Sequence, residues 1–210
     1  MKAACLLIFL VPFAATLPAA EKEKAAPEKD PTCEAGMPPG KYFEKSIYRP
    51  GSTWTTDAGK AIKLDSLRGR PVVMTLFFTN CEHSCPFIVK DMKSVQSGLS
   101  KKARAKVDFV LVSIDPERDS TEALKAFRTK YHLTGARWTL LRSAPASVKE
   151  LAEKIAFNYS PGSKTQFAHS VMITVLNDTG EVAHQQVGIG VDRRGAVATL
   201  EKLANSKSKH

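Results

Sequence analysis

The fold is decided by the stretch PVVMTLFFTNCEHSCP, residues 71–86. Residues 71–79 are almost continuously apolar, which is typical of a strand buried on both faces in the middle of an α/β sheet. Cys81 to Cys85 follow at once as a loop, and Pro86 suits the first turn of a helix, where a missing N–H costs nothing. Apolar residues then recur at helical spacing, at Ile88, Met92, Val95 and Leu99. We therefore predict a strand, a short loop and a helix, with both cysteines at the junction.

The flanking sequence predicts further elements on both sides of this stretch. An N-terminal hairpin is expected from residues 53–56 and 61–64 around the turn 57–60. Residues 107–114 form a second apolar strand, and Asp119 with Glu122 predicts the N-cap and capping box of the next helix. The remaining elements are a strand at 138–141, a helix around 148–155, hairpin strands at 170–176 and 181–187, and a closing helix around 197–203.

These elements alternate as β-α-β-α and then β-α-β-β-α. Alternation implies a parallel sheet with covering helices, and the late hairpin adds antiparallel strands. The predicted fold class is α/β, a thioredoxin-like sandwich with a central mixed sheet flanked by helices and an N-terminal β-hairpin.

The 210 residues suit one folded domain with flanking segments. Residues 1–20 have a positive head, an apolar run and small residues up to Ala20, which predicts a signal peptide; an uncleaved anchor is the alternative. Residues 21–41 are charged and proline-rich, as in a flexible linker. The domain is expected over 42–205, followed by a polar tail at 206–210. The predicted location is the periplasm or the outer side of the cytoplasmic membrane.

The chain is basic, with 31 Lys and Arg against 21 Asp and Glu. The basic residues are mixed with acids rather than clustered with aromatic residues, so nucleic-acid binding is disfavoured. At most, the charge favours an acidic protein partner. An apolar content of 43% excludes wholesale disorder.

The cysteines carry the chemistry, although four are too few for a disulfide scaffold. Cys81 and Cys85 lie at a helix start, where unpaired N–H groups and the helix dipole stabilise thiolates. Two thiolates are a soft pair suited to copper or zinc, and a disulfide would compete with metal for the same sulfurs. Cys5 is expected to leave with the signal segment. Cys33, in the linker, is expected to be a spare thiol, with a disulfide-resolving role as the alternative.

A site with two thiolates needs further ligands, and His169 is the best candidate. In a thioredoxin-like sheet, the loop before the late strand lies opposite the helix-start cysteines, so His169 would face them. On spacing alone, a structural role for His169 is the alternative. His83, inside the cysteine loop, is a candidate auxiliary ligand. The other histidines (His132, His184 and His210) are interpreted as surface or packing residues, and Met74 and Met172 as core residues.

Three separated motifs resemble those of the Sco/SenC copper-chaperone family. They are FTNC-x-x-x-CP at 78–86, VSIDPERDS at 112–120, and FAHS at 167–170 before an Asn-Asp-x-Gly turn. The resemblance covers residues 50–204. It implies a thioredoxin-like fold that binds one copper ion, as Cu(I) or Cu(II), through two cysteines and one histidine. These map to Cys81, Cys85 and His169.

The resemblance also implies a function on the outer side of a membrane. Proteins of this family deliver copper to, or maintain the thiols of, the dinuclear copper centre of cytochrome c oxidase. The implied partners are a copper-receiving respiratory oxidase subunit or another copper protein, together with a thiol reductant. One departure stands out, because Glu82-His83 replaces the Pro-Asp common in the family. The extra imidazole would alter affinity, coordination or the redox potential of the cysteine pair.

Two enzymatic functions stay open beside the non-catalytic metallochaperone. The first is a thiol-disulfide oxidoreductase in which Cys81 attacks and Cys85 resolves. The second is a peroxidase of the peroxiredoxin or glutathione-peroxidase kind, which shares the fold. The peroxidase ranks last because the strand before Cys81 lacks the proline expected ahead of a T-x-x-C motif.

Overall fold

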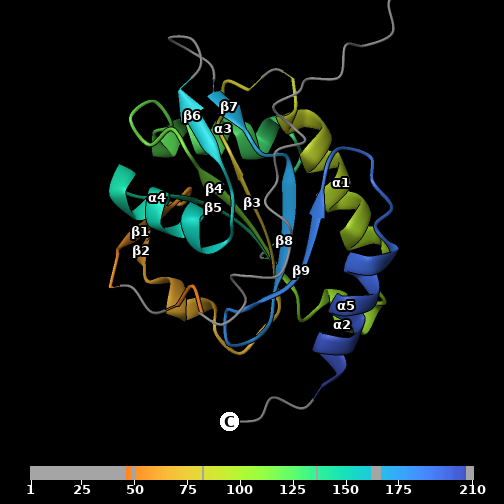
Figure 1. Ribbon diagram of the computed structural model, residues 1–210. Coiled ribbons are helices and arrows are strands. Elements are labelled where there is room, and N and C mark those ends of the chain that lie inside the picture. Colours follow the sequence, from red (N-terminus) through yellow and green to blue (C-terminus); the bar gives the residue numbers. More distant parts are fainter. Residues whose placement is uncertain (1–45, 49–50, 82, 136, 162–166, 207–210) are drawn as a thin grey trace, which may run out of the picture.

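The computed structural model describes residues 46–48, 51–81, 83–135, 137–161 and 167–206 (Figure 1). The predicted signal peptide, linker, Cys5, Cys33 and nearly all of the tail lie outside these residues. Seven strands form the main sheet: β1 (Trp54–Thr56), β2 (Ala61–Ile62), β3 (Val72–Phe77), β4 (Asp108–Ser113), β5 (Trp138–Arg142), β8 (Met172–Leu176) and β9 (Val182–Val187).

The sheet is mixed, with the order β2-β1-β5-β4-β3-β8-β9. Strand β4 lies at its centre and runs parallel to β3 and β5. Strands β1 and β8 run antiparallel to their neighbours β5 and β3, and the β1–β2 and β8–β9 pairs are antiparallel too. The predicted α/β class, the mixed sheet and the N-terminal hairpin are confirmed.

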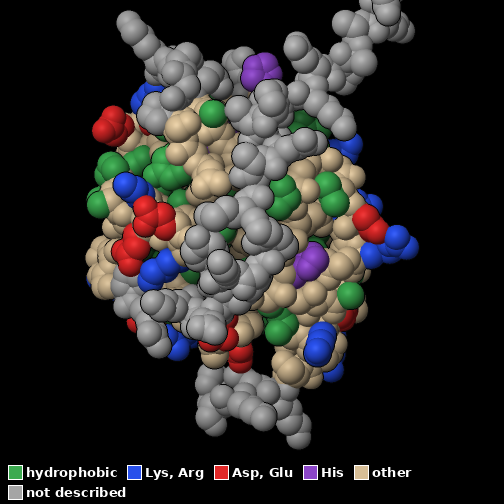
Figure 2. Space-filling model, viewed as in Figure 1, with side chains coloured by type: hydrophobic (Ala, Val, Ile, Leu, Met, Phe, Trp, Pro, Cys, Tyr) green, Lys and Arg blue, Asp and Glu red, His purple; other side chains and the backbone are tan. Residues whose placement is uncertain are grey.

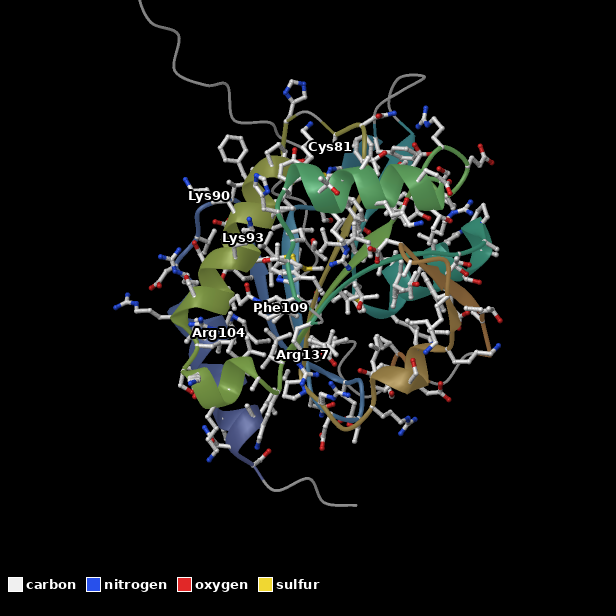
Figure 3. All side chains as sticks on the ribbon, turned by 180° about the vertical axis from the view of Figure 1, so that it is seen from behind. Cys81, Lys90, Lys93, Arg104, Phe109 and Arg137 are labelled. Atoms are coloured by element: carbon white, nitrogen blue, oxygen red, sulfur yellow. The ribbon has the colours of Figure 1, made fainter. Side chains whose placement is uncertain are left out.

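Helices cover both faces of the sheet: α1 (Cys85–Gly98), α2 (Lys101–Arg104), α3 (Thr121–Lys130), α4 (Pro145–Lys154) and α5 (Arg194–Asn205). Helices α1 and α3 lie on one face, with α5 beside α1, and α4 covers the other face (Figures 1 and 3). Lys93 Nζ of α1 donates to the Tyr131 carbonyl at the end of α3, 2.6 Å away. On the opposite face, Gln185 Nε2 of β9 donates to the Ile155 carbonyl after α4, 2.7 Å away.

The core is centred on β3, whose six residues are all buried. Phe77 at its end packs against Phe127 of α3, with ring centroids 4.6 Å apart. Met74 and Met172 are both buried in the core, as predicted. On the face shown in Figure 2, basic and acidic side chains are interspersed, in keeping with the distribution expected from the sequence.

The structure contains elements that the sequence did not predict. A separate two-stranded sheet forms from β6 (Tyr159–Pro161) and β7 (Phe167–His169), in a segment expected to be a loop. The short helix α2 was also missed. The strand expected from residue 170 begins at Met172, because residues 167–169 pair with β6 instead.

The predicted N-cap of α3 is wrong by one residue. Ser120 caps the helix by accepting a hydrogen bond from the Ala123 N–H. Asp119 is fully buried instead, and its carboxylate accepts hydrogen bonds from the Thr79 N–H at 3.1 Å and from the Ser113 hydroxyl at 2.5 Å. Asp119 therefore connects two segments: Thr79, which follows β3 and lies two residues before Cys81, and Ser113 at the end of β4.

We expect Asp119→Ala to lower the free energy of unfolding by roughly 2–4 kcal/mol, because it leaves buried donors on Thr79 and Ser113 without an acceptor. Urea denaturation followed by far-ultraviolet circular dichroism measures the change. Asp65→Ala, at an exposed carboxylate, is the control and should change stability little. Equal stability of the two variants would contradict this role of Asp119.

Candidate metal centre

The two cysteines lie where the central strand passes into the first helix. Cys81 is in the loop after β3 (Figure 3), and Cys85 is the first residue of α1. Both are free thiols, with 6% of Cys81 and none of Cys85 exposed. The loop bends back on itself, since the Cys85 N–H donates to Cys81 Sγ at 3.3 Å. This bend turns both sulfurs toward one point, as the sequence predicted.

The two sulfurs differ in their affinity for a proton. A hydrogen bond with the Cys85 side chain is the largest effect on Cys81 and lowers its pKa to about 3, although burial acts in the opposite direction. The same hydrogen bond and complete burial raise the pKa of Cys85. At neutral pH the pair therefore holds one thiolate, on Cys81, and one thiol proton, on Cys85.

His169 faces this pair from the end of β7. Its Nε2 lies 3.9 Å from Cys81 Sγ and 3.1 Å from Ser84 Oγ. Its Nδ1 lies 2.8 Å from the Ser170 carbonyl oxygen, which can only accept, so Nδ1 carries the proton. The tautomer that this bond selects has its lone pair on Nε2, aimed at the cysteines. An outer hydrogen bond of this kind orients metal-binding imidazoles.

Aromatic rings and the small sheet hold His169 in place. The ring of Phe78 meets it edge-on with centroids 5.7 Å apart, and that of Phe157 stacks on it at 6.0 Å. In the β6–β7 sheet, His169 pairs with Tyr159. Figure 1 shows that this sheet and the loop before α1 lie at the same end of the molecule.

The structure brings three of the predicted site residues together. The ligand atoms of Cys81, Cys85 and His169 all lie within 4.8 Å of one another, which is close enough to hold one metal ion. Among the described residues, no other group of three or more His, Cys, Asp or Glu side chains comes close enough together to hold a metal ion. His83 is exposed and is not one of them, so its auxiliary role stays a prediction.

Two residues that support the site were not identified from the sequence. Ser84 contacts both His169 and Cys81, and Asp119 anchors the loop that carries Cys81. Asp119 was seen only as a helix cap. The sequence signal for both was their place inside motifs already singled out, at 78–86 and 112–120. For the β6–β7 sheet, the signal was the aromatic residues Tyr159 and Phe167, which favour strands.

No helix in the described part of the chain combines the length and the apolar character that crossing a bilayer requires.

Comparison with known proteins agrees with this geometry. The family model SCO1/SenC matches residues 45–205. A SCO1 protein homolog of Bacillus subtilis is 29% identical over 140 residues, which cover 65% of this chain and 72% of the relative. Among solved structures, a SCO1/SenC family lipoprotein from Bacillus anthracis has a TM-score of 0.66 at 25% identity, covering 73% of this chain and 92% of its own. Copper-bound ScoI of Bradyrhizobium japonicum has a TM-score of 0.59 at 21% identity, covering 72% and 96%.

The family model extends across the whole sheet and includes the cysteine loop, the buried Asp119 and the His169 strand. The resemblance seen in the sequence motifs is thereby confirmed, and the chain belongs to the SCO1/SenC family.

Proposed function

We propose that this protein is an exported metallochaperone that binds one copper ion through Cys81, Cys85 and His169. The observation that carries the proposal is the convergence of these three ligand atoms within 4.8 Å. Two thiolate sulfurs suit Cu(I), and the imidazole helps to accommodate Cu(II). The thiolate on Cys81 is already in the state that metal binding needs, and the Nδ1 bond to the Ser170 carbonyl leaves Nε2 of His169 as the ring nitrogen that faces the metal.

The proposed recipient is a copper protein, in particular a respiratory oxidase subunit with a dinuclear copper centre. Sco proteins are a family of cytochrome c oxidase assembly proteins, and ScoI of Bradyrhizobium japonicum binds copper. Export is proposed from the signal-like residues 1–20, and the lipoprotein relative from Bacillus anthracis supports a place outside the cytosol. Fractionation of cells that express the protein tests this location directly.

Exposed apolar side chains lie beside the site. Among the described residues, the large exposed apolar side chains are Phe87, Val187, Ile189 and Val191, with Phe87 52% exposed. The loop after β9 is held to α1 by a hydrogen bond from the Gly190 N–H to Asp91 Oδ2, 2.8 Å long. It is held near His169 by a bond of the same length from the Gly188 N–H to the Val171 carbonyl.

This apolar patch therefore extends from the first turn of α1 to the end of β9 and the loop after it. Lys90, on α1, is exposed at its border, and Figure 3 shows it pointing outward. Arg193, at the start of α5, is exposed as well. A copper-receiving protein with an apolar contact surface bordered by acidic residues would complement this face. We propose that the copper-receiving protein docks on this patch, because copper must leave the protein on the side from which a partner can reach the ligands.

We expect His169→Ala to weaken Cu(II) binding by more than about 100-fold, since loss of a ligand should exceed the 10–100-fold typical of outer hydrogen-bond partners. Cu(I) binding should weaken less, because the two sulfurs remain. Competition titrations with chelators of known affinity measure both. His83→Ala tests the auxiliary ligand, and His132→Asn, at an exposed positive-φ position, is the control. Unchanged Cu(II) affinity in His169→Ala would remove His169 from the site.

The low pKa of Cys81 also favours a second candidate function, a thiol-disulfide oxidoreductase. Because the pKa of Cys81 is lowered to about 3, we expect iodoacetamide to alkylate Cys81 at a nearly constant rate from pH 5 to pH 8. Peptide mass spectrometry should find Cys81 modified well before Cys85. A rate that rises tenfold per pH unit would contradict the assignment. Rapid exchange with a partner disulfide in copper-free protein would favour the oxidoreductase.

We expect Ile189→Asp to slow copper transfer to the isolated copper domain of an oxidase subunit by about tenfold, the effect of losing one good apolar contact at an interface. Copper affinity should not change, because Ile189 contacts none of the three ligands. Stopped-flow absorbance measures the transfer. Ala146→Asp adds the same charge on α4, on the opposite face of the sheet, and should transfer normally. Equal transfer rates in both variants would place docking elsewhere.

A further inference from the structure

Ser84 occupies the N-cap position of α1 but does not cap the helix. Serine is favoured at this position because its hydroxyl accepts a hydrogen bond from a backbone N–H of the first turn. Ser84 makes no such bond, and its backbone has helical φ and ψ angles of −86° and −34°. Its hydroxyl is directed into the site, 3.1 Å from His169 Nε2 and 3.4 Å from Cys81 Sγ. The side chain thus contacts two of the three ligand atoms.

The hydrogen atoms around His169 determine what Ser84 can do. Nδ1 uses its proton on the Ser170 carbonyl, so Nε2 is an acceptor. Cys81 Sγ is also an acceptor, since it already receives the N–H of Cys85 at 3.3 Å. A serine hydroxyl has one hydrogen to donate. Ser84 therefore donates to either Nε2 or the sulfur, and it cannot serve both at once.

We propose that Ser84 is a positioning residue that favours Cu(I) over Cu(II) at this site. Without copper, its hydroxyl donates to Nε2 and holds the His169 ring toward the cysteines. A metal that takes the Nε2 lone pair removes that acceptor. The hydroxyl is then left with Cys81 Sγ, which lies within reach without any movement of the helix.

The consequence for copper follows from the charge on the sulfur. A hydrogen bond to a metal-bound thiolate withdraws electron density from it, and hydrogen bonding around a cysteine sulfur tunes the potential of copper sites. The less donating sulfur stabilises Cu(II) less than Cu(I). This inference rests on the proposed copper-binding function and adds a determinant of the oxidation state that the site prefers.

The test compares Ser84→Ala with Ser84→Thr, which keeps the hydroxyl, and with Ser97→Ala, an exposed serine on the same helix. We expect Ser84→Ala to lower the ratio of Cu(I) to Cu(II) affinity by about tenfold, the effect of one hydrogen bond to a charged group. Ser84→Thr should restore the ratio, and Ser97→Ala should leave it unchanged. The two affinities come from chelator competition with Cu(I) or Cu(II) alone.

A second measurement uses copper-free protein. Nitrogen-15 NMR of His169 should show Nε2 as a hydrogen-bonded acceptor in the wild type and in Ser84→Thr, and as a free acceptor in Ser84→Ala. An unchanged affinity ratio in Ser84→Ala, or an unchanged Nε2 signal, would overturn the role of Ser84 while leaving copper binding intact. Failure of the wild type to bind either ion would instead overturn the proposed function, and the NMR result would still report on the hydrogen bond.

Discussion

The hydrogen bonds of the buried Asp119 carboxylate are the interaction on which the site depends. A charged group without exposure is retained only where donors surround it, and Thr79 and Ser113 supply them here. These bonds connect the chain leaving β3 with the end of β4, so the loop that follows has a fixed starting point. Cys81 lies two residues further on, and its position is therefore set by the sheet and not by the loop alone.

The cysteine pair combines metal binding and thiol chemistry in one arrangement. Cys81 is held as a thiolate chiefly by its hydrogen bond with Cys85, whereas Cys85 is buried and keeps its proton. Binding of a metal by both sulfurs must release the proton of Cys85, and formation of a disulfide would occupy both sulfurs. Metal binding and disulfide formation are therefore mutually exclusive states of the same two sulfur atoms.

The side of the site that faces outward is chemically distinct from the side that holds the ligands. Inside, Phe78 and Phe157 enclose the His169 ring. Outside, Phe87 and the loop after β9 expose apolar side chains next to exposed basic residues. His83 is exposed in the same loop as the cysteines.

Much of the fold could be predicted from sequence patterns, because they reflect local geometry. The continuous apolar run of β3 and the helical spacing after Cys85 depend on neighbours in the chain, and both predictions are confirmed. The family motifs also named three residues, Cys81, Cys85 and His169, whose ligand atoms the structure brings within 4.8 Å of one another. The exact cap of α3 and the β6–β7 sheet were predicted wrongly or missed, since each depends on partners distant in the chain.

The sequence by itself determined the residue types, the order of the strands and helices, and the pairing of two cysteines at a helix start. Only the tertiary structure decided that Ser120, and not Asp119, caps α3, and that the Asp119 carboxylate accepts a hydrogen bond from Thr79 instead. It also decided that the Ser84 hydroxyl turns away from its helix toward His169. The physical reason is that a polar side chain takes the partner that burial brings within reach, and burial is a property of the whole packed sheet rather than of neighbouring residues.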